Sequence, residues 1–218
     1  MKRKLKVLIA AGPTVEYIDP VRFISNRSTG VMGYALASEA KKRKHAVTLI
    51  TGPVNIFPPR GANLVRIRTA GELKRALFRE IKKSDCLIMA SAVCDFRPAR
   101  FSGKKISSGR TLTLRLVKTK DILKSLSKKY KKKKVLIGFS LETGDNLKKA
   151  REKMRDKSLD LIISNKITKD NDPFGAGCKE FFILERGRPY KKLKNTSKNA
   201  ASRAILDSAE RLCYTRKN

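Results

Sequence analysis

Short apolar runs that alternate with stretches of helical periodicity constrain this chain more than any other feature. The runs are β-branched and nearly continuous, as in parallel strands buried on both faces. They predict strands at residues 7–10, 46–50, 64–67, 86–90, 135–139 and 159–163. The segments between them predict helices at residues 33–43, 72–82 and 145–157. This alternation indicates an α/β fold, a Rossmann-like doubly wound sheet that is mainly parallel.

Two further segments interrupt the alternation. Residues 111–117 and 180–184 read as half-exposed strands, and we expect them to form an additional strand layer outside the main sheet, with an edge used in dimerisation. Residues 198–214 predict a terminal helix capped by Thr196 or Ser197. Because neither an internal repeat nor a low-complexity linker is apparent, we expect residues 1–218 to form a single domain.

The charge balance is strongly basic, with 52 Lys and Arg against 19 Asp and Glu and a net charge of +33. Such a balance favours anionic partners, either nucleic acid or a polyphosphate substrate. The alternative is a set of solvated lysine-rich faces. The basic runs at residues 41–44 and 128–134 fall where helices should end and where cations complement the helix dipole. A nucleic-acid partner is unlikely, since no recognised binding motif appears.

The cysteines and histidine point away from a structural metal site. Cys86, Cys94, Cys178 and Cys213 form no C-x-x-C pair, and His45 is the only histidine, so structural zinc is improbable. Nothing suggests a disulfide framework, which agrees with a reducing cytoplasm. The apolar stretch near the N-terminus is too short for a signal peptide, and no run is long enough for a membrane span. We therefore expect a cytoplasmic location and no membrane partner.

The first strand is followed by an unusually long connection. A dinucleotide-binding fold has a tight G-x-G-x-x-G turn at this point, whereas here Gly30 and Gly33 follow much later. Ser28 and Thr29 precede the helix, so the segment is either a phosphate cradle or ordinary capping with glycines for close packing. The missing turn argues against a nicotinamide or flavin oxidoreductase, which remains an alternative alongside a nucleic-acid-binding module.

Several polar residues in loops could perform chemistry. Asn26 could donate a hydrogen bond to an oxyanion, or it is a turn residue. Arg22 could reach a phosphate or carboxylate. Asp95 follows the fourth strand, where ligand sites of such sheets lie, although a lone Asp there is often a cap. Lys104 and Lys105, in the segment GKKISSG, either bind phosphates or lie in solvent.

The predicted helix at residues 145–157 carries Lys149, Lys153 and Lys157 on one face. Like charges at this spacing repel each other. A bound anion would remove the repulsion, although in a chain this rich in lysine the stripe could also be coincidence.

The order of the motifs carries more information than any one of them. The segments IDPVRFISNRSTGVMGYALA, TLITGPV, SAVCDFRP, KKI, GFSLET and LDLIISN follow one another along the chain. This series resembles the phosphopantothenoylcysteine synthetase (phosphopantothenate–cysteine ligase) family from about Val7 to the terminal helix, most specifically over residues 18–33. Because the synthetase-like strand follows Met1 directly, the chain looks like a stand-alone form without the decarboxylase domain and its FMN.

The resemblance implies a ligase of coenzyme A biosynthesis. Such an enzyme joins 4'-phosphopantothenate to L-cysteine through an acyl-nucleotide, releasing pyrophosphate and a nucleoside monophosphate. It implies Mg²⁺ with CTP rather than ATP as co-substrate, an acyl-cytidylate intermediate and a homodimer. These steps fit the chemistry, since a carboxylate must be activated before an amine can attack it, and departing pyrophosphate needs cations.

The resemblance also assigns residues to roles. It implies Asn26 and Lys105 as catalytic, and Arg22 as a residue that reaches the phosphopantothenate of the neighbouring subunit. The implied nucleotide-binding residues are Gly12, Ser28, Gly30, Gly33, Asp95, Lys105, Phe139, Lys153, Lys157 and Asn165. The implied phosphopantothenate-binding residues are Arg22, Asn26, Ser91, Ala92 and Asp95.

Four departures from the family pattern affect the loops, and no metal ligand is assigned. One is that the K-I-K-K form is reduced to Lys104-Lys105-Ile106-Ser107, which leaves open which of the two lysines is catalytic. Pro13 stands in AGPT where A-G-G-T is usual, and Ser91 stands where A-A-V begins. Lys120 replaces the proline of T-P-D-I. None removes a catalytic group, so the departures bear on base selectivity more than on reaction type.

Overall fold

One eight-stranded sheet runs through the protein in the computed structural model, which describes residues 3–109, 111–167 and 179–216. Its strands lie in the order β12-β11-β10-β9-β6-β1-β4-β5. The six from β10 to β5 are parallel, which confirms the predicted mainly parallel α/β sheet. Their bounds are β1 (Lys6–Ala11), β4 (Ala46–Thr51), β5 (Asn63–Arg66), β6 (Cys86–Met89), β9 (Val135–Glu142) and β10 (Leu161–Lys166).

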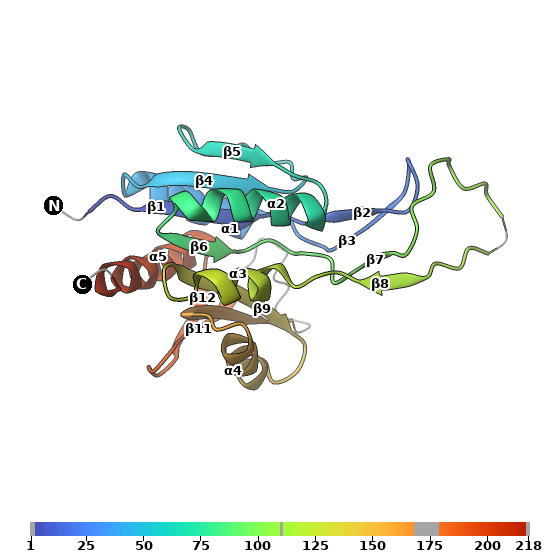
Figure 1. The fold of residues 1–218 in the computed structure, drawn as a ribbon. Coiled ribbons are helices and arrows are strands. Elements are labelled where there is room, and N and C mark those ends of the chain that lie inside the picture. The colour runs from blue at the N-terminus through green and yellow to red at the C-terminus, as the bar shows by residue number, and fades with distance from the viewer. Residues whose placement is uncertain (1–2, 110, 168–178, 217–218) are drawn as a thin grey trace.

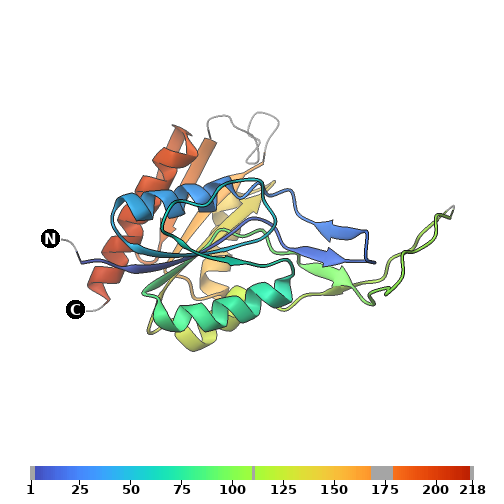
Figure 2. The same cartoon turned by 90° about the horizontal axis from the view of Figure 1, so that it is seen from above.

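Helices cover both faces of this sheet (Figure 2). The helices of one face are α1 (Val31–Lys42) and α5 (Lys198–Thr215). Those of the other face are α2 (Ala70–Glu80), followed by the short η1 (Ile81–Lys83), then α3 (Ile122–Tyr130) and α4 (Asn146–Asp156). Within the described residues, none of these helices combines the length and the apolarity needed to cross a membrane.

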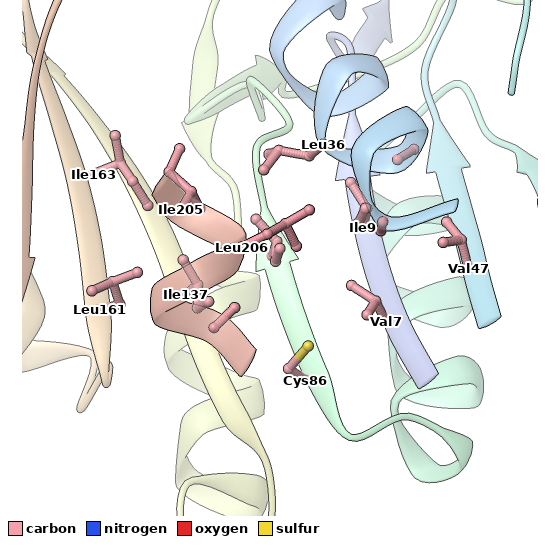
Figure 3. Packing of buried hydrophobic residues seen from close by; sticks show 14 of the residues in the cluster. Val7, Ile9, Leu36, Val47, Cys86, Ile137, Leu161, Ile163, Ile205 and Leu206 are labelled. Atoms are coloured by element: carbon pink, nitrogen blue, oxygen red, sulfur yellow. The ribbon is translucent and has the colours of Figure 1, made fainter. Parts of the chain in front are cut away.

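The core has two aliphatic layers, because successive side chains of a strand point to opposite faces. Along β1, Val7 and Ile9 pack toward α1 and α5, whereas Leu8 packs toward α2 and α3. Figure 3 shows the first layer, with Ile9 beside Leu36 of α1 and with α5 side chains close to β9. Each fully buried Leu or Ile stabilises the fold by roughly 1.5–3 kcal/mol.

The prediction of an extra strand layer is wrong for residues 180–184. The segment at residues 180–184 belongs to β11 (Lys179–Glu185), which pairs antiparallel with β10 inside the main sheet. β12 (Lys191–Thr196) then closes the sheet as an antiparallel edge strand. An antiparallel hairpin can extend a parallel sheet at its edge, so half-buried strands at this end need no second layer.

The other predicted outer strand is shorter than expected. Only Leu116–Lys118 (β8) of the segment at residues 111–117 is a strand, and it pairs with β7 (Phe96–Pro98). β2 (Val15–Tyr17) and β3 (Phe23–Ser25) form a second small ladder. Both ladders lie beyond the carboxyl ends of the central strands of the sheet (Figures 1 and 2). We call the described residues within 15–25 and 96–118 the arm.

The helix ends agree with the charge pattern of the sequence. Basic side chains occupy the last turns of α1 and α3, as predicted for residues 41–44 and 128–134. Ser197 caps α5, since its Oγ accepts the Ala200 N–H at 3.2 Å. Of the two predicted caps, Ser197 is therefore the right one.

Candidate functional site

The strand order places a crevice at the carboxyl ends of β1 and β6. From β1 the chain continues to β4 and β5 on one side, and then crosses to β6, β9 and β10 on the other. Ligands bind at such reversals in open α/β sheets. The two loops are joined there, because the Thr14 N–H donates to the Ala92 carbonyl at 3.1 Å and the Ala92 N–H donates to the Gly12 carbonyl at 2.9 Å.

A cleft of about 320 Å³ opens at this reversal. It unites residues from six separate segments of the chain. The predicted site residues that line it are Ser28, Gly30, Gly33, Ser91, Ala92, Asp95, Phe139 and Asn165. The sequence reading did not single out Ser140, Phe181 and Lys198, which also line it. Lys198 begins α5, so only the folded packing of α5 beside α1 brings it here.

The start of α1 supplies the anion-binding part of the cleft. The N-cap is Gly30, with φ 77°, and no side chain caps the helix. Capping by Ser28 or Thr29 is therefore wrong, because the N-cap lies after both hydroxyls. Backbone N–H groups of an uncapped first turn remain available to an anion. This is the arrangement that the phosphate-cradle interpretation requires.

Three glycines in and beside the cleft are required by packing. A Cβ on Gly33 would lie 2.4 Å from the Ala11 Cβ, so glycine lets α1 press against β1. A Cβ on either Gly12 or Gly30 would lie 2.8 Å from Cγ1 of Val54, and both have positive φ. Gly12 lies beside Gly30 but is not among the residues that line the cleft.

Asn26 lies at the rim of the cleft. Its Nδ2 donates to the Val93 carbonyl at 2.9 Å, and Val93 lines the cleft. Its side chain is exposed, so a substrate can reach it. On the opposite loop the Asp95 carbonyl accepts the Thr119 N–H at 2.8 Å, which ties that loop to the base of the arm.

Arg22 and Lys105 lie together on the arm, away from the cleft lining. Asp19 is fully buried and accepts the N–H groups of Val21, Arg22 and Ile106 at 2.8, 2.7 and 3.1 Å. Burial alone raises the pKa of Asp19, but these N–H groups and the Arg22 charge hold it below its ordinary value. Arg22 Nη1 pairs with Asp19 at 2.9 Å and donates to the Ile106 carbonyl at 3.0 Å. The exposed Lys105 therefore adjoins Arg22.

The lysine stripe of α4 is balanced by carboxylates of the protein. Lys149 lies 3.3 Å from Glu142, and Lys153 forms a shorter ion pair with the same carboxylate. Lys157 lies 3.0 Å from Asp121. Burial raises the pKa of Glu142, but hydrogen bonds from Lys153 and neighbouring groups lower it further than burial raises it. A bound anion is thus not needed to offset the repulsion.

Lys157 nevertheless lies close to the cleft. It lines a second cavity, the adjoining basin, of about 390 Å³, together with Asp121 and Lys120. Asp95 and Phe139 line both spaces, so the two are adjacent. Lys153 is not among the residues that line either.

The chemistry of the cleft fits a metal ion brought in by phosphates. Within the described ranges, no three His, Cys, Asp or Glu side chains gather as a metal site. Asp95 is the carboxylate that lines the cleft. Mg²⁺ keeps several waters and binds through one or two carboxylates plus substrate phosphates, so Asp95 could contribute to such a site. Cys86, Cys94 and Cys213 are buried free thiols, and Cys178 lies outside the described residues.

Comparison with known proteins identifies relatives over nearly the whole chain. The bifunctional coenzyme A biosynthesis protein CoaBC of Bacillus subtilis is 41% identical over 202 residues, covering 92% of this chain and 50% of that protein. A cysteine/cysteine sulfinic acid decarboxylase from an unknown prokaryotic organism is 38% identical, covering 92% of this chain and 56% of that protein. The chain thus spans about half the length of these relatives.

A solved structure and a family model cover the same region. The crystal structure of the C-terminal domain of CoaBC superposes with a TM-score of 0.84 at 31% identity, covering 99% of this chain and 98% of that one. The model for the C-terminal domain of DNA/pantothenate metabolism flavoproteins matches residues 2–212. The chain therefore belongs to the family of DNA/pantothenate metabolism flavoprotein C-terminal domains.

Proposed function

We propose that this protein joins 4'-phosphopantothenate to L-cysteine at the expense of a nucleoside triphosphate. The observation that carries the proposal is the cleft at the β1–β6 reversal, which gathers eight residues expected from the ligase resemblance. The coenzyme A role of the CoaBC relative supports the same reaction. Neither step of the reaction transfers an electron, so the ligase chemistry itself needs no FMN.

The proposed reaction has two steps. The phosphopantothenate carboxylate attacks the α-phosphorus of the triphosphate, which forms an acyl-nucleotide and breaks the bond to pyrophosphate. The cysteine amine then attacks the acyl carbonyl, and the nucleoside monophosphate leaves as the amide forms. We assign the phosphates to the uncapped first turn of α1, where backbone N–H groups favour negative charge. A magnesium ion, when bound, offsets the charge of the triphosphate.

Asn26 and Lys105 take different roles in this scheme. Asn26 carries a neutral donor at the rim of the cleft, which suits the acyl carbonyl as it becomes an oxyanion. Lys105 carries a positive charge, which suits the departure of pyrophosphate. We assign Ser91, Ala92 and Asp95, which line the cleft, to binding phosphopantothenate beside Asn26.

Pyrophosphate release tests the reaction. The purified protein should release pyrophosphate with Mg²⁺ only when phosphopantothenate and a nucleoside triphosphate are both present. Added cysteine should yield phosphopantothenoylcysteine, detectable by mass spectrometry. The ligase proposal fails if phosphopantothenate gives no pyrophosphate with any of the four common triphosphates.

We further propose CTP as the preferred nucleotide. Lys153 and Lys157 follow the bacterial form of the family pattern, and Lys157 lines the basin that adjoins the cleft. Initial rates with CTP and ATP at matched concentrations decide the matter. A kcat/KM about tenfold higher with ATP, equivalent to about 1.4 kcal/mol in the transition state, would overturn this choice.

A homodimer completes the proposal. The arm, which contains Arg22 and Lys105, extends away from the sheet (Figures 1 and 2). Neither residue lines the cleft of its own chain. Exposed apolar side chains on the arm offer a surface that a second copy can cover: Val21, Phe23, Phe96, Phe101, Leu112, Leu114 and Leu116. Analytical ultracentrifugation with activity assays tests this, since a fully active monomer at micromolar concentration contradicts it.

A further inference from the structure

A second basic cavity lies where the arm joins the sheet. It has a volume of about 410 Å³ and lies between the start of α2 and the β7–β8 ladder. Four cationic side chains line it: Lys74 from α2, Arg97 from β7, Lys118 from β8, and Lys120 from the loop before α3. We call it the basic cavity.

The four cations of the basic cavity have no carboxylate partner among the residues that the structure describes. No ion pair joins any of them to a carboxylate in residues 3–109, 111–167 and 179–216. Glu16 is the acidic residue in the lining, and it is buried, with its Oε1 accepting the Ala70 N–H at 2.8 Å. Lys149, Lys153 and Lys157, by contrast, each pair with a carboxylate of the protein. The basic cavity therefore presents unbalanced positive charge.

The basic cavity lies next to the basin that adjoins the proposed reaction site. Lys118, Thr119, Lys120 and Ile122 line both it and the adjoining basin, which shares Asp95 with the cleft. Thr119 fixes the junction, because its N–H donates to the Asp95 carbonyl at 2.8 Å and its Oγ1 donates to the Cys94 carbonyl at 2.6 Å. An anion that leaves the cleft on this side meets the four cations.

We propose that the basic cavity binds phosphoryl groups and receives the pyrophosphate that leaves the cleft. The inference rests on the proposed ligase function, which supplies that anion. Planar guanidinium groups and mobile ammonium groups both recognise phosphate oxygens, and the cavity offers one guanidinium and three ammonium groups. Lys120 stands where the family pattern has proline, so one of the four charges is a feature of this chain.

Two sources could supply the phosphoryl group: pyrophosphate, or the phosphate monoester of phosphopantothenate. Lys74 and Arg97 line the basic cavity but neither the basin nor the cleft. Replacing them therefore changes the cavity without removing a group that lines the reaction site. Lys83 is an exposed lysine at the far end of the same helical segment, in η1, and Lys83→Gln is the matched control for a lost charge.

The test is calorimetric titration of the unmodified protein and its variants with magnesium pyrophosphate, and separately with phosphopantothenate. The double variant Lys74→Gln/Arg97→Gln should weaken pyrophosphate binding by at least about tenfold, since hydrogen bonds to charged groups are among the strong ones. Phosphopantothenate binding should change less than about twofold in that variant, and Lys83→Gln should leave both constants unchanged.

The outcomes separate the two proposals. Unchanged pyrophosphate binding in the double variant overturns the basic-cavity inference, whether or not the protein is a ligase. Weakened phosphopantothenate binding with unchanged pyrophosphate binding also overturns it and assigns the cavity to the monoester. Because these titrations need no turnover, failure of the ligase reaction is detected separately, in the pyrophosphate-release assay.

Discussion

The sheet and the arm differ in how they cover their apolar side chains. Leu8 and Ile88, in the sheet, are 0% exposed. On the arm, Val21 is 60% exposed, Phe23 53% and Phe101 59%. The sheet with its helices buries its own core, whereas the arm presents large apolar side chains with no cover from the described parts of its own chain. We therefore propose that a second copy of the chain covers the arm.

The largest effect on stability is expected for a buried residue of the sheet. Ile88→Ala leaves a cavity between fully buried neighbours and should lower the free energy of unfolding by about 2–5 kcal/mol. Urea denaturation followed by far-UV circular dichroism measures the change. Phe57→Ala is the control, because Phe57 is 95% exposed and surface substitutions change stability by about 0.5 kcal/mol or less. Equal losses in the two variants would contradict a self-sufficient core.

The next effect concerns the two proposed catalytic residues, one at the cleft and one on the arm. Asn26→Asp places a negative charge beside the developing oxyanion and should cost about 3 kcal/mol in the second step, so that acyl-nucleotide accumulates. Lys105→Gln should suppress the first step, so that no acyl-nucleotide forms. Mass spectrometry of quenched reactions, with and without cysteine, separates the two. The assignment is wrong if both variants block the first step equally.

A mixture of these two variants tests whether Lys105 acts in its own cleft or in the cleft of the partner. If Lys105 serves the cleft of the partner, then a heterodimer of Asn26→Asp and Lys105→Gln chains contains one intact site. Random mixing should restore about a quarter of the wild-type activity, as expected for a two-fold dimer with shared sites. If Lys105 serves its own cleft, every site in the mixture stays defective and no activity returns.

A smaller effect is expected for the apolar surface of the arm. Phe101→Ser removes a large apolar side chain from the proposed interface and should raise the dimer dissociation constant by about tenfold, as lost apolar burial of this size predicts. Sedimentation velocity over a concentration series measures the constant. Phe57→Ser removes the same side chain from the loop between β4 and β5, and it should leave the dissociation constant unchanged. An equal rise of the dissociation constant in both variants would show that the arm is not part of the interface.

The smallest effect is confined to acid solution. Because the folded pKa of Asp19 is lowered, its stabilisation of the arm is complete above the unfolded pKa of about 4 and is lost as pH falls through the folded pKa. Amide exchange near Ile106 should therefore accelerate in that acid range, relative to amides of the sheet. In Asp19→Asn this pH dependence should disappear, and its persistence would exclude Asp19 as the titrating group.

The sequence predicted the sheet well, because buried parallel strands are short apolar runs. The predicted strand at residues 46–50 differs from β4 by one residue at its end. Only the end of α3 was predicted, from the basic run at residues 128–134; its start was missed, since its lysines obscure the apolar stripe of Ile122, Leu126 and Tyr130. β12 was missed for a related reason, because an edge strand of sequence KKLKNT carries the charges that protect edges from pairing.

The cleft was predictable to the extent that its residues follow strand ends. Ser91 and Asp95 follow β6, and the carboxyl ends of parallel strands meet at one edge. Lys198 was not predictable in this way, since its place depends on how α5 packs beside α1. Arg22 and Lys105 could be expected only from the family resemblance, because neither follows a strand end and neither lines the cleft of its own chain.

The contact between Val54 and two glycines restricts how this sequence can change. One methyl carbon, Cγ1 of Val54, occupies the space that a Cβ at Gly12 or at Gly30 would need. A smaller residue at position 54 would free that space, but the positive φ of both glycines would still disfavour a side chain. Val54, Gly12 and Gly30 lie in separate loops, yet a substitution at any one of these positions must fit the residues present at the other two.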